Sequence, residues 1–112
     1  MFKQINRKMY KSNEISHVHF EPTQRCQALC PMCDRTNNPH IKNAELTIEQ
    51  FKQIIDSDFA KQLNSFLMCG NHGDPMVAKD TLGMYEWLRY NNSKLYLHMT
   101  TNGGGRSDDW WR

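Results

Sequence analysis

The sequence contains no long hydrophobic run. Its first fifteen residues, MFKQINRKMYKSNEI, include basic residues but no apolar stretch, so no signal peptide is expected. No segment approaches the length needed to span a membrane. The excess of positive over negative charge is small as well, because the net charge is only +2. A nucleic-acid-binding surface normally shows clustered Lys and Arg. The sequence therefore predicts a cytoplasmic protein without a membrane or nucleic-acid partner.

Neither disorder nor several domains are indicated. Of the 112 residues, 38% are hydrophobic and 23% are charged, an ordinary balance that argues against disorder. The length allows at most one small domain with a modest core.

Cysteine is scarce too, but three of the four cysteines lie within eight positions, in RCQALCPMCDR. In a reducing cytoplasm such closely spaced cysteines are more often metal-binding or catalytic than disulfide-bonded.

Three segments have strand character, and helical patterns follow them. Residues 17–20, HVHF, alternate so that Val18 and Phe20 face one way and the two histidines the other. Thr47 and Gln50 then form a capping-box signature that begins a helix. The apolar residues of this helix recur at helical spacing: Ile48, Phe51, Ile54, Ile55 and Phe59.

The second and third units repeat this order. Residues 66–69 form a continuous apolar run, as expected for a strand buried on both faces. Residues 79–92 predict a helix with four apolar side chains roughly on one side, Leu82, Tyr85, Trp87 and Leu88. Alternation at residues 95–100 predicts the third strand. Ser107 has the character of an N-cap for a third helix, whose sequence stops within its first turn.

Strands that alternate with helices imply a parallel sheet and an α/β fold of three βα units. In such folds the chemistry gathers in the loops that follow the strands. The unusual residues fall in those loops: Cys26, Cys30 and Cys33 after the first strand, Gly73, Asp74 and Pro75 after the second, and Thr101, Asn102 and Gly103 after the third. We therefore expect the three loops to share one edge of the sheet. A helix cut off in its first turn is not stable alone, so the chain is expected to be truncated there.

The cysteine spacing predicts a metal centre. Spacings of three and two intervening residues let one loop wrap a compact inorganic core, with each thiolate directed at a different iron. A four-iron, four-sulfur cubane normally takes four cysteines. Three cysteines leave one iron open, and an open coordination position is the usual mark of a metal site that performs chemistry. A zinc site completed by Cys69, His19 or His72 is the alternative, and it would make the chain a non-enzymatic zinc-binding module.

At these cysteines the chain resembles the radical S-adenosylmethionine (radical SAM) superfamily, whose hallmark CxxxCxxC is met by Cys26, Cys30 and Cys33. The resemblance implies a 4Fe-4S cluster whose fourth iron binds S-adenosylmethionine. It implies an enzyme that cleaves this cofactor reductively to a 5'-deoxyadenosyl radical, which abstracts hydrogen from a substrate. The implied fold is a partial (βα) barrel. Residues 15–112 would be the N-terminal half of the core domain, after an extension at residues 1–14.

The resemblance extends to the later loops. The glycine-rich "GGE" type motif of the family corresponds to Gly73, Asp74 and Pro75, with aspartate in place of glutamate and His72 at the first glycine position. The backbone of this motif is expected to meet the amino group of S-adenosylmethionine. Met32 stands where the family usually has an aromatic residue near the adenine, and Asn102 corresponds to a contact with the methionine portion of the cofactor.

The resemblance also implies partners. A reductant such as a flavodoxin or ferredoxin would supply the electron, and the substrate would be a peptide or a small metabolite. Half a barrel leaves a strand edge and apolar helix faces exposed, so we expect a missing C-terminal half or self-association. A catalytically inactive fragment is the other alternative for such a chain.

Overall fold

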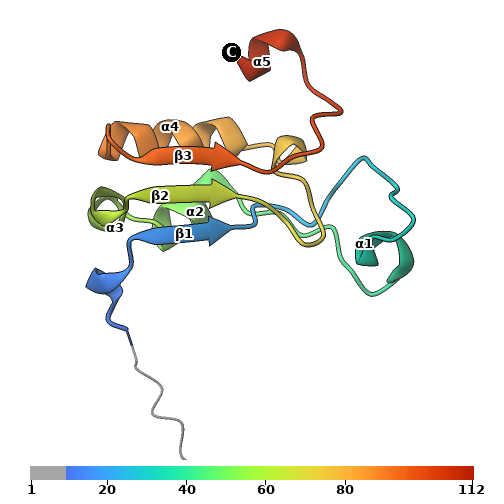
Figure 1. Ribbon diagram of the computed structural model, residues 1–112, viewed down its shortest axis with the longest axis horizontal. Coiled ribbons are helices and arrows are strands. Elements are labelled where there is room, and N and C mark those ends of the chain that lie inside the picture. The colour runs from blue at the N-terminus through green and yellow to red at the C-terminus, as the bar shows by residue number, and fades with distance from the viewer. Residues whose placement is uncertain (1–9) are drawn as a thin grey trace, which may run out of the picture.

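The chain forms a three-stranded parallel sheet with helices, an α/β fold as expected (Figure 1). The computed structural model describes residues 10–112, so residues 1–9 of the expected extension lie outside the described part. The strands are β1 (His17–Phe20), β2 (Ser65–Met68) and β3 (Tyr96–Met99), hydrogen-bonded in the order β1-β2-β3. Within the described residues β1 and β3 are therefore the two edges of the sheet.

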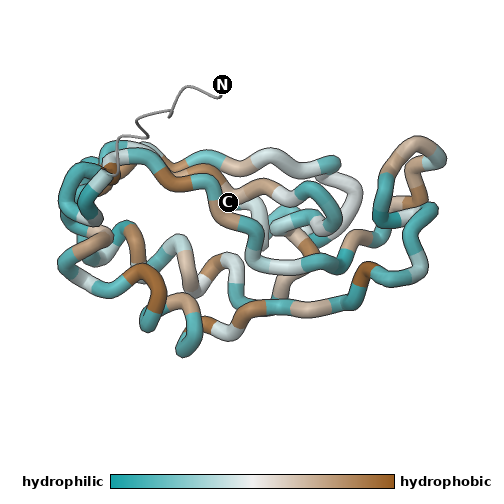
Figure 2. Tube along the Cα trace, turned by 90° about the horizontal axis from the view of Figure 1, so that it is seen from below, coloured by the Kyte–Doolittle hydropathy of each residue, from teal (hydrophilic) through white to brown (hydrophobic). Residues whose placement is uncertain are grey.

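One face of the sheet carries the core. Strand register brings Val18, Phe66 and Leu97 into one row across the sheet. The next row on the same face is formed by Phe20, Met68 and Met99. Helices cover this face, so the sheet and the helices form two layers (Figure 2). The opposite face carries a different row: His19, Leu67 and His98.

The prediction that β2 is buried on both faces was wrong in part. Phe66 and Met68 are fully buried, whereas Leu67 on the other face is only half-buried. Within residues 10–112 helices pack against one face alone, so the apolar run at residues 66–69 overstates the burial of the strand. The alternation predicted for β1 and β3 is confirmed by the register.

The first crossover contains two helices where the sequence predicted one. They are α2 (Ile48–Ile54) and α3 (Ser57–Gln62). The break follows from Asp56, whose carboxylate accepts a hydrogen bond from the Phe59 amide at 2.8 Å and so begins a new helix. Ile54 is consequently 54% exposed and not part of the core. The capping box of Thr47 and Gln50 is confirmed at the start of α2.

The second crossover is α4 (Thr81–Asn91), preceded by the 3-10 turn η2 (Pro75–Val77). Its buried residues are Thr81, Met84 and Leu88. Leu82 was predicted on the apolar side but is 40% exposed, because the covered stripe of this helix is narrow. Trp87 is held at the edge of the stripe, where its indole donates to the Ile55 carbonyl at 3.0 Å.

Three short elements complete the described chain. A 3-10 turn, η1 (Ser12–Glu14), precedes β1, and α1 (Asp34–Asn37) lies within the loop that follows it. The last element is α5 (Asp108–Trp111), where the Ser107 side chain accepts from the Trp110 amide as predicted for an N-cap. No helix among residues 10–112 is long and apolar enough to cross a membrane.

Candidate functional site

The segments that follow the three strands meet at one edge of the sheet, which we call the rim: residues 21–35, 69–80 and 100–106. The Asp74 amide donates to the Arg25 carbonyl at 2.9 Å, which joins the first segment to the second. The Asn102 amide donates to Asp74 Oδ2 at 2.8 Å, which joins the second to the third. The prediction that three loops share one edge is confirmed by these contacts.

Asp74 is the polar centre of the rim. Only 5% of the residue is exposed, and both carboxylate oxygens accept hydrogen bonds. Oδ1 accepts from the Met76 amide at 3.0 Å and from the Thr101 hydroxyl at 2.7 Å. Oδ2 accepts from the Asn102 amide. A buried carboxylate needs such donors, so the side chain of Asp74 is committed to fixing the second loop against the third.

Gly73 lies against the exit of β1. A Cβ added at Gly73 would come within 1.9 Å of the Thr23 carbonyl oxygen and 2.6 Å of its carbon, closer than any side chain tolerates. The absence of a side chain therefore lets two backbone segments of the rim touch. The sequence analysis expected the backbone of this motif to meet the amino group of S-adenosylmethionine. In the structure the chain's own β1 exit lies against Gly73.

The first loop of the rim carries three free thiols, those of Cys26, Cys30 and Cys33. Cys26 and Cys33 are half-buried, and Cys30 is exposed. A turn closed by the Cys33 amide and the Cys30 carbonyl, 3.1 Å apart, leads into α1, which lies at the far end of the loop from the sheet (Figure 1). Within residues 10–112 no three His, Cys, Asp or Glu side chains lie close enough together to hold a metal ion. The metal-ligand role of the cysteines thus stays a prediction, although soft thiolates are the donors that iron–sulfur clusters take.

Asn102 belongs to the third loop of the rim and lies beside Cys26 of the first loop. Its side-chain amide donates to Cys26 Sγ at 3.6 Å and to Gln27 Oε1 at 3.4 Å. The Gln27 amide returns a hydrogen bond to Asn102 Oδ1 at 2.7 Å. No sequence pattern selected Gln27 beyond its position next to a cysteine. The structure thus places a predicted site residue of the third loop against a predicted metal ligand of the first.

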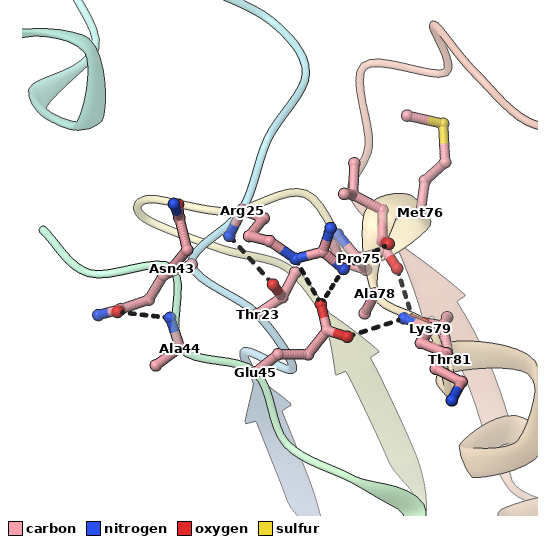
Figure 3. Close-up of polar contacts among 12 residues, drawn as sticks. Thr23, Arg25, Asn43, Ala44, Glu45, Pro75, Met76, Ala78, Lys79 and Thr81 are labelled. Carbon is pink, nitrogen blue, oxygen red and sulfur yellow. Dashed lines mark hydrogen bonds and ion pairs between the residues drawn. The ribbon is translucent and has the colours of Figure 1, made fainter.

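A second polar network fixes the base of the cysteine loop (Figure 3). Arg25 Nε lies 3.0 Å from Glu45 Oε1, and Glu45 Oε2 accepts from the Lys79 amide at 3.1 Å. Burial alone would raise the pKa of Glu45, but hydrogen bonds from Arg25, Lys79 and Thr23 hold that pKa below its ordinary value. Sequence reasoning missed this network because its members come from three separate segments.

The three residues that could complete a zinc site lie on different segments of the chain. His72 Nε2 lies 3.1 Å from Asp34 Oδ2, at the first residue of α1. Cys69 continues β2, and its pKa is raised by burial and then by the charge of Glu21. His19 points to the face of the sheet without helices. Met32, predicted near an adenine, is 95% exposed.

A shallow hollow lies next to this arrangement. It has a volume of about 280 Å³ and is lined by Gln27, Met76, Val77, Gly105 and Arg106. Arg106 forms one wall and donates to the carbonyls at the end of η2, with Nε 2.7 Å from the Met76 oxygen. The rim therefore offers a ligand a recess directly beside Gln27 and the cysteine loop.

Comparison with known proteins gives a distant likeness. The chain is 24% identical over 96 residues to GTP 3',8-cyclase of Desulforamulus reducens, a match that covers 82% of this chain. It spans only 28% of the length of that relative. No protein-family model and no solved structure matches the chain. GTP 3',8-cyclase is a radical SAM enzyme, so the likeness suggests the radical SAM superfamily and nothing narrower.

Proposed function

We propose that this chain is part of a radical SAM enzyme, with a 4Fe-4S cluster on Cys26, Cys30 and Cys33 and an S-adenosylmethionine site at the rim. The observation that carries the proposal is the contact series from Cys26 through Asn102 to Asp74, which unites the three loops that the motifs occupy. The distant likeness to a radical SAM enzyme supports it independently.

The cysteine loop supplies three thiolates and no fourth. To hold a cluster, the cysteine loop would close around it, because within residues 10–112 the three thiols are not grouped as ligands of one metal ion. None of the three cysteines is buried, so the loop can close without breaking much core packing. When bound and reduced, such a cluster supplies the electron that cleaves S-adenosylmethionine into methionine and the 5'-deoxyadenosyl radical.

The remaining rim residues would orient the cofactor. Because the carboxylate of Asp74 is committed to Met76, Thr101 and Asn102, the backbone of the Gly73 to Pro75 turn would meet the amino group. Met32 and Asn102 stay candidate contacts for the adenine and the methionine portion. The hollow at the rim is shallow and open to solvent. Closure of the cysteine loop over it would therefore also exclude water from the site.

The proposal includes a partial (βα) barrel and its partners. The parallel sheet with its helices on one face is the arrangement expected of consecutive βα units. The free edges of β1 and β3 would be covered by the rest of such a barrel or by self-association. A flavodoxin or ferredoxin would deliver the electron in the cytoplasm. The substrate would be a peptide or a small metabolite, and the relative makes GTP the first metabolite to test.

Anaerobic reconstitution tests the proposal. The protein is incubated with ferrous iron and sulfide under reducing conditions, desalted and analysed for iron, zinc and visible absorption. We expect a brown protein with about four irons per chain, and loss of that iron when Cys26, Cys30 and Cys33 are replaced by alanine. Cys69→Ala is the matched control and should keep its iron. A colourless protein that holds one zinc, released by Cys69→Ala or His72→Ala, would replace the proposal with the zinc-binding module.

Enzymatic activity requires a separate measurement. The reconstituted chain is reduced with dithionite in the presence of S-adenosylmethionine, and 5'-deoxyadenosine is quantified by chromatography. Formation of 5'-deoxyadenosine that depends on the three cysteines supports an enzyme. An iron-loaded protein that forms none would support the inactive fragment instead.

A further inference from the structure

The side chain of Asn102 is held in one orientation beside the sulfur of Cys26. Its backbone amide is fixed by the buried carboxylate of Asp74 at 2.8 Å. Its side-chain oxygen accepts from the Gln27 amide at 2.7 Å and from the Gly104 amide at 2.8 Å. With the oxygen engaged on two donors, the NH₂ group is left to face Cys26 Sγ and Gln27 Oε1. The orientation of the amide is thereby set by four neighbouring groups.

A donor in this position would act on the sulfur of Cys26 when that residue ligates iron. In the structure the Cys26 thiol donates to Gln27 Oε1 at 3.7 Å, and the Asn102 amide donates to the same sulfur. A cysteine that ligates iron is a thiolate and has no proton to donate. The contact with Gln27 Oε1 would then be lost as a hydrogen bond, whereas the one from Asn102 would strengthen, because its acceptor becomes anionic.

We propose that Asn102 is a hydrogen-bond donor to the Cys26 thiolate and raises the reduction potential of the cluster, with Gln27 as the residue that orients it. This inference rests on the proposed function. Hydrogen bonds to cysteine sulfur stabilise the negative charge that accumulates on reduction, and they are one of the determinants of cluster potential. The role differs from a contact with the methionine portion of S-adenosylmethionine, because it is exerted on the cluster before any cofactor binds.

The test measures reduction potential without S-adenosylmethionine. Wild type, Asn102→Leu and Asn102→Asp are reconstituted with iron and sulfide, and each is titrated with dithionite while the reduced cluster is followed by electron paramagnetic resonance. We expect all three to hold iron and the potential to become more negative in the order wild type, Leu, Asp. Leucine removes the donor, and aspartate adds a negative charge beside the sulfur as well.

A matched pair of variants controls for surface changes at the rim. Asn71 lies on the second loop of the rim and donates its side-chain amide to Glu21 Oε1 at 2.9 Å, on an exposed surface. Asn71→Leu and Asn71→Asp repeat the same two changes of side chain there. Both should leave the potential as in wild type. A shift in the Asn71 variants equal to that in the Asn102 variants would show a general field effect and overturn the inference.

Gln27→Leu tests the inference even if the Asn102 variants take up little iron. It leaves Asn102 in place but removes the group that orients its amide, so we expect full iron content and a potential between wild type and Asn102→Leu. Iron-loaded variants with the wild-type potential would overturn the inference and leave the proposed function intact. Low iron in Asn102→Leu together with an unchanged potential in Gln27→Leu would show a structural role alone. Wild-type protein that takes up no iron would overturn the proposed function itself.

Discussion

Arg25 and Glu45, twenty positions apart in the chain, form an ion pair at the base of the cysteine loop. Arg25 immediately precedes Cys26, and its carbonyl accepts from the Asp74 amide. Glu45 belongs to the segment that returns toward α2 and forms a β-bridge with Thr23. The pair therefore fixes the residue that precedes the first predicted ligand to the rest of the rim.

Glu45→Gln should destabilise the protein in a pH-dependent way. We expect a loss of about 1 kcal/mol at pH 7, because both side chains are partly exposed and solvent screens the pair. The lowered pKa of Glu45 means that its contribution is present above its ordinary value, 4.5, and is lost as the pH falls through its folded-state value. Urea unfolding at pH 7 and at acid pH measures the difference. A gap between variant and wild type that widens on acidification would contradict this account.

Gly73→Ala should strongly destabilise the chain, whereas Gly83→Ala should not. The first Cβ would overlap the Thr23 carbonyl, and backbone must move to relieve it. We expect a cost of about 3 kcal/mol. The second Cβ would lie 3.8 Å from the nearest Ile48 carbon, inside α4, where alanine is favoured over glycine by about 0.5–1 kcal/mol. Thermal unfolding of both variants compares them. Equal effects would show that Gly73 is not packed as described.

Asp74→Asn should loosen the third loop. An amide in place of the carboxylate directs an NH₂ group at one of the donors that Asp74 now satisfies, at a cost of about 3 kcal/mol. Hydrogen exchange should become faster at the Asn102 amide, while urea unfolding reports the lost stability. Asp58→Asn, an exposed change on α3, serves as the control and should alter the free energy of unfolding by less than about 0.5 kcal/mol. Unchanged exchange at Asn102 would argue against the role of Asp74.

Tyr85→Phe should remove one hydrogen bond between α4 and β3. The Tyr85 hydroxyl donates to the His98 carbonyl at 2.7 Å, so its loss should cost about 1 kcal/mol. Burial raises the pKa of Tyr85 well above the ordinary tyrosine value. Its contribution is thus present below the ordinary value, 10.0, and is lost as the pH rises through the folded-state value. Ultraviolet titration should show one late-ionising tyrosine that is absent in Tyr85→Phe and retained in Tyr90→Phe, a change at an exposed residue.

Local patterns predicted the strands and caps well. The alternation at residues 17–20 and the capping box at Thr47 depend on neighbours within four positions, and the structure confirms both. The convergence of three loops followed from a general property of parallel sheets and is also confirmed. The helix break at Asp56 was missed because the apolar spacing continues through it, whereas a single capping carboxylate decides the geometry.

Local sequence patterns could not predict which tertiary partners the polar residues have. A Gly-Asp-Pro turn has the same sequence whether its carboxylate binds a ligand or other residues of the chain. In the structure Asp74 binds residues of the chain. The partner of Arg25 could not be selected either, because any carboxylate in a nearby loop satisfies the same rule. The metal-ligand role of Cys26, Cys30 and Cys33 stays a prediction. The cofactor contacts of Met32 and Asn102 stay predictions as well.

The buried carboxylate of Asp74 has a consequence for engineering this chain. Its three donors lie on two different loops, so a transplanted second loop would bring a buried carboxylate that keeps the Met76 amide and loses its two donors from the third loop. A foreign third loop grafted onto this chain would face the same problem unless it supplied the equivalents of Thr101 and Asn102. Loop exchange between this protein and others should therefore transfer residues 69–80 and 100–106 as one cassette.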